Sequence, residues 1–476
     1  MAKALESNSK SRKEIILIKY AIFSRLLVLF LTILWRSLLQ PYDTSAALNP
    51  PCLYQKEDSS LFLVANVYFL ENSVVWDSVY FLRITECGYE YEQTYPFLPL
   101  LPFFISLLSR TAVMVLSGST VSNLAFIFAA IYLFRVSVIV LKDIEASFRA
   151  SIIFCFNPAS IFYSTIYSES LYALFSIGGV YHLLSGSSNV GVLWFALSGC
   201  ARSNGILNAG YICFQTMHRA YEALYQKRRA YVLIAGFLRC ICMCLPFVAF
   251  QAYGYYNICH GHTLDEMRPW CKGRIPLLYN FIQSHYWGVG FLKYFQFKQL
   301  PNFLLASPIL SLVVCSIISY MKSRPELFIS LGFQVTEKEK RSAARLYSLK
   351  DAVEPSVKTS TNEGNRDIRQ RKPSSKKDVT VTKVAAESNS PEKSGYLSAD
   401  VFPFIVHLSF MATMAFFIMH VQVATRFLSA SPPLYWFASS LIGSPKHSKW
   451  GYLICSYCAA YILLGTLLLS NFYPFT

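Results

Sequence analysis

The amino-acid sequence predicts an all-α integral membrane protein, polytopic, with about ten transmembrane helices. Of its 476 residues, 54% are hydrophobic and only 15% are charged, and the mean hydropathy is +0.37. An ordinary soluble domain is about 25% charged, so this chain has too few charges to cover folded domains in water. Apolar stretches of about 20 residues, the length that crosses a bilayer, also recur along the chain. These features exclude a simple soluble enzyme, a disordered regulator and a DNA-binding protein with a basic coat.

The first predicted span covers residues 15–39 and follows a basic leader. We interpret it as a retained helix because it is longer than the apolar part of a signal peptide and no small-residue cleavage site follows promptly. The further predicted spans cover residues 97–116, 120–141, 148–165, 168–185, 190–212, 230–253, 302–320, 400–420 and 450–470.

The distribution of charge predicts the orientation of these spans, because cytoplasmic loops of membrane proteins are enriched in Lys and Arg. Residues 321–399 hold 16 basic and 10 acidic side chains, whereas residues 40–95 hold 2 basic and 8 acidic ones. The net charge of +16 therefore reports orientation and does not indicate a nucleic-acid partner. We place 321–399 in the cytosol and 40–95 in the lumen.

The predicted domain organisation follows from these assignments. It comprises a cytosolic N-terminus (1–14), a transmembrane core (15–320) with luminal loops 40–95 and 254–301, a cytosolic loop (321–399), and C-terminal transmembrane helices (400–476) with a luminal loop 421–449. The cytosolic loop is rich in Lys, Ser, Thr and Glu, a composition that predicts disorder. A solvated loop and a tether to the lipid surface both fit it.

Two pairs of cysteines share predicted luminal loops. Cys52 and Cys87 lie in the first loop, and Cys259 and Cys271 lie in another. An oxidising lumen would permit disulfides there, but the sequence does not determine which cysteines pair. No Cys/His spacing along the chain resembles a zinc site.

Trp76-Asp77 is the first candidate for chemistry. The apolar spacing from Val74 to Ile84 predicts a helix that lies along the membrane surface. An Asp beside aromatic side chains at this depth is partly desolvated and becomes a better proton acceptor. The alternative is a solvated loop carboxylate, and Glu71, Glu90 and Glu92 are expected to be solvated.

The second candidate lies in residues 156–176. Asn157-Pro158 predicts a helix break at membrane depth, which is tolerated only beside protein or a watered cavity. Glu169 follows among apolar residues, and a carboxylate there indicates function by default. A plain helix-turn-helix with Glu169 at its polar tip is equally compatible with the sequence.

Two further clusters contain arginine. Arg202 lies in an apolar stretch near Asn204, and its guanidinium needs either an anion such as phosphate or a partner such as Glu169. Arg426 follows a predicted span, and it either holds a lipid phosphate or anchors its helix at the headgroups. His420 and Gln422 precede Arg426 in the same motif.

These clusters, in this order, resemble the GPI mannosyltransferase 2 family, whose members add the second mannose to the glycosylphosphatidylinositol (GPI) precursor. The resemblance rests on Trp76-Asp77 with Gly88-Tyr89, and on the strings "NPASIF", "YSESL", "RSNG" and "HVQVATRFLSASPPLYW". It covers most of the chain from about residue 15 onward, with 321–399 as the departure.

The resemblance implies a GT-C type glycosyltransferase of the endoplasmic reticulum (ER) membrane with a luminal active site. Its substrates would be dolichyl phosphate mannose and the GPI precursor glycolipid, joined by an α-1,6 linkage. A β-linked donor and an α product imply one inverting displacement. The implied base is Asp77, with Arg202 and Arg426 as phosphate holders. Trp76, Glu169, Asn204, His420 and Gln422 complete the predicted substrate-binding set.

A lipid-linked monophosphate donor also predicts a reaction without metal or other cofactor, and the chain has no D-x-D motif. The sequence leaves open whether the protein works with a small membrane partner subunit. The alternatives are another GT-C glycosyltransferase and a polytopic lipid or solute transporter. A transporter would place its polar groups near the bilayer midplane, whereas here they concentrate in outer loops and at helix ends.

The predicted orientation is testable with reporter glycosylation sites. We expect a reporter in residues 40–95 to be glycosylated in ER membranes, because the lumen holds the glycosylation machinery, and a reporter in 321–399 to stay unmodified. Gel mobility before and after glycosidase treatment measures both. The reverse pattern would invert the orientation.

Overall fold

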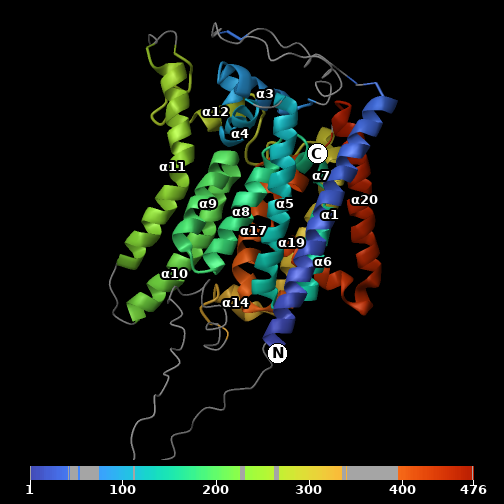
Figure 1. The fold of residues 1–476 in the computed structure, drawn as a ribbon. Coiled ribbons are helices and arrows are strands. Elements are labelled where there is room, and N and C mark those ends of the chain that lie inside the picture. The colour runs from blue at the N-terminus through green and yellow to red at the C-terminus, as the bar shows by residue number, and fades with distance from the viewer. Residues whose placement is uncertain are drawn as a thin grey trace, which may run out of the picture.

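The computed structural model of the protein describes residues 2–40, 42, 52–53, 74–110, 113–225, 231–261, 267–334, 339, 395–473 and 475 (Figure 1). Within these ranges every regular element is a helix, as the sequence predicts. Most of the segments 40–73 and 321–399 falls in the gaps, so the predicted disorder of 321–399 lies largely outside the described residues.

Six of the described helices are long and apolar enough to cross a membrane. They are α1 (Ala2–Leu38), α5 (Met114–Leu141), α11 (Tyr231–Cys259), α13 (Leu300–Ser323), α17 (Phe402–Phe417) and α20 (Ser448–Ser470). Each coincides with one of the predicted spans. The predicted count of about ten is not confirmed, because the other four predicted spans are broken or short.

Shorter helices take the place of these four predicted spans. The predicted span 97–116 contains only α4 (Leu100–Leu108) before α5 begins. Residues 148–165 divide into α6 (Ile144–Cys155) and α7 (Ser160–Ser164) at Asn157-Pro158, as the sequence predicts. The region 168–225 forms α8 (Glu169–Leu184), α9 (Ser188–Ala201), the 3-10 helix η3 (Ser203–Asn208) and α10 (Ala209–Tyr225).

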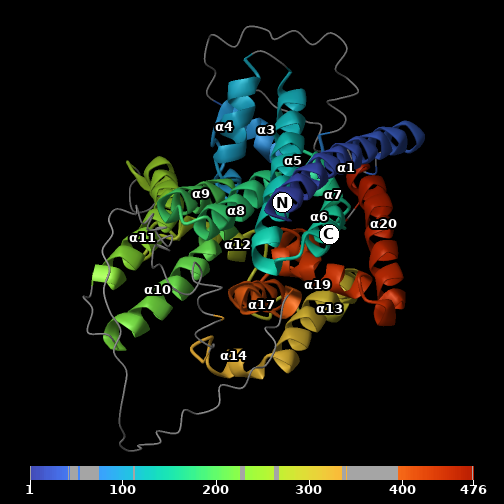
Figure 2. The ribbon, with the colours of Figure 1, turned by 60° about the horizontal axis from the view of Figure 1, so that its bottom comes forward.

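Helix α5 is the centre of the bundle. In Figure 2, α8 to α11 lie on one side of α5, and α1, α6, α19 and α20 lie on the other. Helices α8 and α9 approach closely because Gly178 and Gly179 face Trp194 and Phe195, where a Cβ would come within 2.3 and 2.6 Å of the rings. Small residues at such contacts allow helices in a membrane to pack tightly.

Short helices gather at the end of the bundle opposite the start of α1 (Figure 1). They include α3 (Asp77–Cys87), η2 (Glu92–Thr94), α12 (Leu278–His285) and η4 (Phe297–Gln299). We call this the α3 end. The start of α1 and helix α14 (Pro325–Ile329) lie at the other end. Which end faces the lumen stays a prediction.

Residues 421–449 differ from the single loop that we predicted. They contain η7 (Val421–Val423), α18 (Ala424–Leu428), α19 (Pro432–Ile442) and η8 (Pro445–His447). Trp436 is 1% exposed, and its indole N–H donates to Ser137 Oγ at 2.7 Å. Helix α19 ends beside the start of α6, where Ser439 Oγ donates to the carbonyl of Ala146. It therefore runs through the core to the end where α1 begins, instead of staying at the α3 end.

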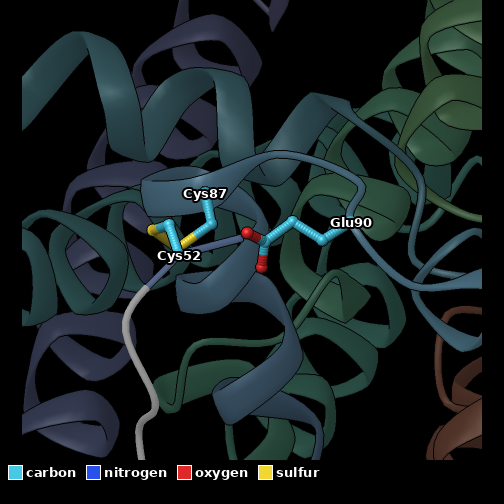
Figure 3. Close-up of side chains that lie close together, drawn as sticks. All are labelled: Cys52, Cys87 and Glu90. Carbon is cyan, nitrogen blue, oxygen red and sulfur yellow. A yellow bond between two sulfur atoms is a disulfide. The ribbon is translucent and has the colours of Figure 1, made fainter. Parts of the chain in front are cut away.

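Both cysteine pairs form disulfides within their own loops. Cys52 is bonded to Cys87 at the end of α3, and Cys259 is bonded to Cys271. Glu90 lies beside the first disulfide (Figure 3), but both sulfurs are consumed by that bond, so the group is not a metal site. The Glu90 side chain is 1% exposed and accepts from Arg83 at 2.7 Å. The prediction that Glu90 is solvated is therefore wrong.

Glu92 is a second buried carboxylate that the sequence analysis placed in solvent. Its side chain is 7% exposed. The indole N–H of Trp270 and the hydroxyl of Tyr286 both donate to it, the latter at 2.9 Å. Glu92 thereby connects η2 to the segment that follows α11, at the α3 end of the bundle.

Arg324 joins the two described ends of the predicted cytosolic loop. Its guanidinium donates to the carbonyl of Leu397 at 3.0 Å and contacts Glu326 and Glu339. Leu397 belongs to η5 (Gly395–Leu397), which is followed by η6 (Ala399–Val401) and α17. Arg324 therefore holds the end of α13 against η5, although the two elements are far apart in the sequence.

Candidate active site

Asp77 is positioned by the first turn of α3. It is the first residue of this helix, where the helix dipole favours a carboxylate. Trp76 precedes it with φ 52°, a left-handed conformation that is rare for a bulky residue. The Asp77 backbone N–H donates to the hydroxyl of Tyr167 at 3.2 Å. The predicted helix at Val74–Ile84 is confirmed, although it begins at Asp77.

The break between α6 and α7 brings the next part of the chain to Asp77. Asn157 is fully buried, and its Oδ1 accepts the N–H of Ala159 at 2.8 Å while its Nδ2 donates to the carbonyl of Phe154. An Asn side chain can replace helical backbone bonds in this way. Pro158 lacks an N–H and ends α6. The chain then turns through α7 and reaches Tyr167 and Glu169.

Glu169 is the first residue of α8 and is 2% exposed. Its Oε1 pairs with a guanidinium nitrogen of Arg202, the residue between α9 and η3. This is the partner that the sequence analysis left open for Arg202 beside phosphate. Burial of an unpaired carboxylate is very costly, so the ion pair accounts for the charge at this depth.

Arg426 on α18 completes the group. Its guanidinium donates to Asp77 Oδ2 at 2.9 Å, and its Nε lies 3.7 Å from Glu169 Oε1. The rings of Phe162 and Tyr167 lie 5.3 and 5.8 Å from the guanidinium carbon. Burial lowers the pKa of Arg426, but Asp77 and Glu169 more than offset this and raise it above the usual value. Arg426 is therefore a permanent cation.

The structure thus joins four predicted residues in one chain of charges, Asp77–Arg426–Glu169–Arg202, which we call the charge network. Two carboxylates and two guanidiniums balance, so the network is neutral overall. The two carboxylates differ in how exposed their side chains are. The side chain of Asp77 is 33% exposed and that of Glu169 is 2% exposed. A substrate can therefore approach Asp77, whereas Glu169 can act only through its arginine partners.

The "RSNG" turn holds Arg202 against the end of α9. A Cβ on Gly205 would lie 2.3 Å from the backbone of Gly199 and Ser198, so this close approach requires glycine. Ser203 Oγ hydrogen-bonds to the Tyr279 hydroxyl at 2.7 Å. Asn204 is 7% exposed, and neither polar atom of its side chain has a hydrogen-bond partner among the described residues. It is thus the least satisfied polar group of the turn.

The structure places His420 and Gln422 in a different cluster. The His420 ring stacks on Tyr294 with 4.5 Å between centroids. The Tyr294 hydroxyl donates to Gln422 Oε1 at 3.0 Å and accepts from Asn302 at 2.8 Å. This cluster precedes α18 and orients the chain that carries Arg426. Trp76 lies beside the network, with its ring 6.2 Å from that of Phe472.

Sequence reasoning missed the tyrosines of the site. Tyr167 accepts the Asp77 N–H, and burial raises the pKa of its hydroxyl well above the usual value. Tyr163 hydrogen-bonds to Ser429 Oγ at 2.8 Å and so links α7 to the turn after Arg426. Both lie in the strings "NPASIF" and "YSESL" or between them, but nothing in a single sequence separates them from the other aromatic residues.

Comparison with known proteins identifies the family of this chain. The sequence model described as Mannosyltransferase (PIG-V) matches residues 12–476. The chain belongs to this mannosyltransferase family. It is therefore a glycosyltransferase, and the transporter interpretation is set aside.

Relatives in this family come from animals and fungi. The chain is 29% identical to "GPI alpha-1,6-mannosyltransferase 2" of Homo sapiens, over 98% of this chain and 99% of the human protein. It is 30% identical to "GPI mannosyltransferase 2" of Drosophila pseudoobscura pseudoobscura, over 84% of this chain and 86% of the relative. The corresponding protein of Gibberella zeae is 24% identical over 92% of this chain and 95% of its own length. No solved structure matches the chain significantly.

The close backbone approach at Gly205 generates a stability prediction. We expect Gly205→Ala to lower the unfolding temperature in detergent, because an added Cβ displaces backbone, a type of overpacking that typically costs about 1–3 kcal/mol. Gly199→Ala is the matched control, since a Cβ there meets only Met243 O at an ordinary 3.6 Å. Equal unfolding temperatures for the two variants would contradict the requirement for glycine.

Proposed function

We propose that this mannosyltransferase transfers mannose from dolichyl phosphate mannose to the first mannose of the GPI precursor and forms an α-1,6 linkage. The observation that carries the proposal is the pairing of an accessible carboxylate, Asp77, with Arg426 in a family of mannosyltransferases. The names of the relatives supply the acceptor class and, for the human protein, the linkage. The donor follows from the resemblance and from the chemistry of the site.

The reaction is an inverting displacement in one step. The Asp77 carboxylate accepts the proton of the acceptor hydroxyl while the hydroxyl oxygen attacks the anomeric carbon of the donor. The bond from this carbon to the phosphate oxygen breaks, and the electron pair leaves with dolichyl phosphate. The attack comes from the face opposite the leaving group, so a β-linked donor yields an α product.

Two arginines are suited to the leaving phosphate. The side chains of Arg426 and Arg202 are 17% and 18% exposed, so each can reach a ligand without leaving Glu169. The phosphate gains negative charge as the bond breaks, and fixed cations stabilise this charge more in the transition state than in the ground state. Glu169 holds the two guanidiniums in place. We propose that Trp76 and Asn204 bind the substrates beside this centre, and that His420 and Gln422 bind them from the neighbouring cluster around Tyr294.

We place the protein in the ER membrane with the α3 end in the lumen. The six long apolar helices support a membrane location. The two disulfides support an oxidising compartment, because Cys52–Cys87 and Cys259–Cys271 both lie at the α3 end or in the loops that lead to it. The bilayer also presents both lipid-linked substrates to the protein. A small membrane partner subunit is compatible with this arrangement.

The assignment of Asp77 as the base is testable by substitution. We expect Asp77→Asn to lower mannose transfer by at least about 10²-fold, because an amide cannot accept the proton. The measurement is transfer of labelled mannose from dolichyl phosphate mannose to a GPI precursor that carries one mannose. Glu86→Gln is the matched control, since Glu86 is an exposed carboxylate on the same helix.

Two outcomes of this assay would contradict the proposal. Wild-type transfer by Asp77→Asn would remove Asp77 as the base. Transfer to a different glycan, or a product that resists α-1,6-specific mannosidase, would favour another glycosyltransferase reaction. Complementation of cells that lack the second GPI mannosyltransferase, scored by surface GPI-anchored protein, tests the same proposal in cells.

The proposed donor also predicts that the reaction needs no metal ion. Its leaving group is a monophosphate, whose charge two arginines can balance, unlike the diphosphate of a nucleotide sugar. We expect the transfer rate of the purified protein to be unchanged by excess EDTA. A loss of activity that Mn²⁺ or Mg²⁺ restores would show that a cation takes part.

A further inference from the structure

Arg25 lies in the middle of α1 and is 2% exposed. A cation inside a membrane-spanning helix is costly and is retained where it has a specific partner. Among the described residues no carboxylate pairs with it. Its guanidinium instead lies 3.8 Å from the ring centroid of Phe126 on α5. A group of oxygen acceptors surrounds the rest of the guanidinium.

These acceptors belong to both sides of the break between α6 and α7. One terminal nitrogen donates to the carbonyl of Ser160 at 2.9 Å and to Ser164 Oγ at 3.0 Å. The other donates to the carbonyl of Cys155 and to Ser160 Oγ, both at 3.2 Å. Arg25 therefore bridges the last residue of α6 and both ends of α7.

The break needs such a donor. In a continuous helix the N–H of Ala159 would bond to the carbonyl of Cys155, but here it bonds to Asn157 Oδ1. The Cys155 carbonyl would otherwise be a buried acceptor in a membrane, which is costly. The planar guanidinium, with several donors in fixed directions, can satisfy acceptors on both sides at once.

The same turn leads directly into the site. Phe162 of α7 lies beside the guanidinium of Arg426. Three residues after α7, Tyr167 receives the Asp77 N–H, and Glu169 then begins α8. From α5, Asn123 Nδ2 donates to the carbonyl of Ser164 at 3.3 Å. The position of Asp77 relative to Arg426 thus depends on a turn that Arg25 holds from one side and α5 holds from the other.

We propose that Arg25 is a positioning residue for the transfer reaction, acting through the α6–α7 break on Tyr167, Asp77 and Arg426. This inference rests on the proposed function. Arg25 does not touch the substrate, because its guanidinium is enclosed by protein. A substitution that keeps the charge of Arg25 but loses its planar set of donors displaces the reacting groups. It leaves the surfaces that bind the two lipids in place.

The test compares Arg25→Lys with a second variant on the same helix. Lysine keeps the charge but is a point donor that cannot bridge both sides of the break. We expect Arg25→Lys to lower kcat by at least about tenfold, since displacement of reacting groups by about 1 Å costs up to about 10²-fold, with both KM values unchanged. Arg36→Lys is the control, because Arg36 bonds to the carbonyl of Ser470, away from the break, and we expect it to keep wild-type kcat.

Amide hydrogen exchange supplies a readout that does not depend on the substrate. We expect faster exchange in the peptide that covers residues 156–169 in Arg25→Lys, and wild-type exchange there in Arg36→Lys. Unchanged exchange and unchanged kcat in Arg25→Lys would overturn the inference. A fall in kcat that matches a loss of folded protein would overturn it also. If the wild type transfers no mannose, the proposed function fails, while the exchange result still decides whether Arg25 holds the break.

Discussion

The buried carboxylate of Glu169 is the constraint on which the site depends. A carboxylate that is 2% exposed must be compensated by cations, and neither of its oxygens makes a regular hydrogen bond among the described residues. Arg202 and Arg426 supply this compensation from elements far apart in the chain. The α9–η3 turn, α8 and α18 must therefore converge, and Arg426 then reaches Asp77 on α3. The requirement to neutralise one buried charge thus assembles the residues that we assign to the reaction.

The second constraint is the polar backbone of the α6–α7 break. Hydrocarbon cannot satisfy free carbonyls and N–H groups, so the break exists only because protein groups replace the lost helical bonds. Asn157 supplies them from within the turn, and Arg25 and Asn123 supply them from α1 and α5. The central helices and the site are therefore coupled. The same polar contacts that allow a break in the membrane also fix the direction in which Tyr167 and Glu169 leave it.

The sequence predicted the features that local pattern determines. The six long spans, the break at Asn157-Pro158 and the helix predicted over Val74–Ile84 all follow from apolar spacing and proline. It also identified all four members of the charge network, and one of two open interpretations of Arg202 was its pairing with Glu169. Features that depend on distant partners were not predictable. Glu90 and Glu92 resemble solvated loop residues until Arg83 and Trp270 are placed beside them. The sequence of α19 fits the predicted luminal loop as well as a buried helix, because prolines and aromatic residues occur in both settings.

A double-mutant cycle of Glu169 and Arg202 on the mannose-transfer rate tests the central claim most directly. Glu169→Gln removes the charge that holds both arginines, and Arg202→Met removes one of them. If these residues act as one network that positions Asp77 and Arg426, the double variant is no slower than the slower single variant, which corresponds to a coupling of about 0.5–3 kcal/mol. If the rate losses of the two single variants multiply in the double variant, the residues act independently, and the buried charge network does not organise the site.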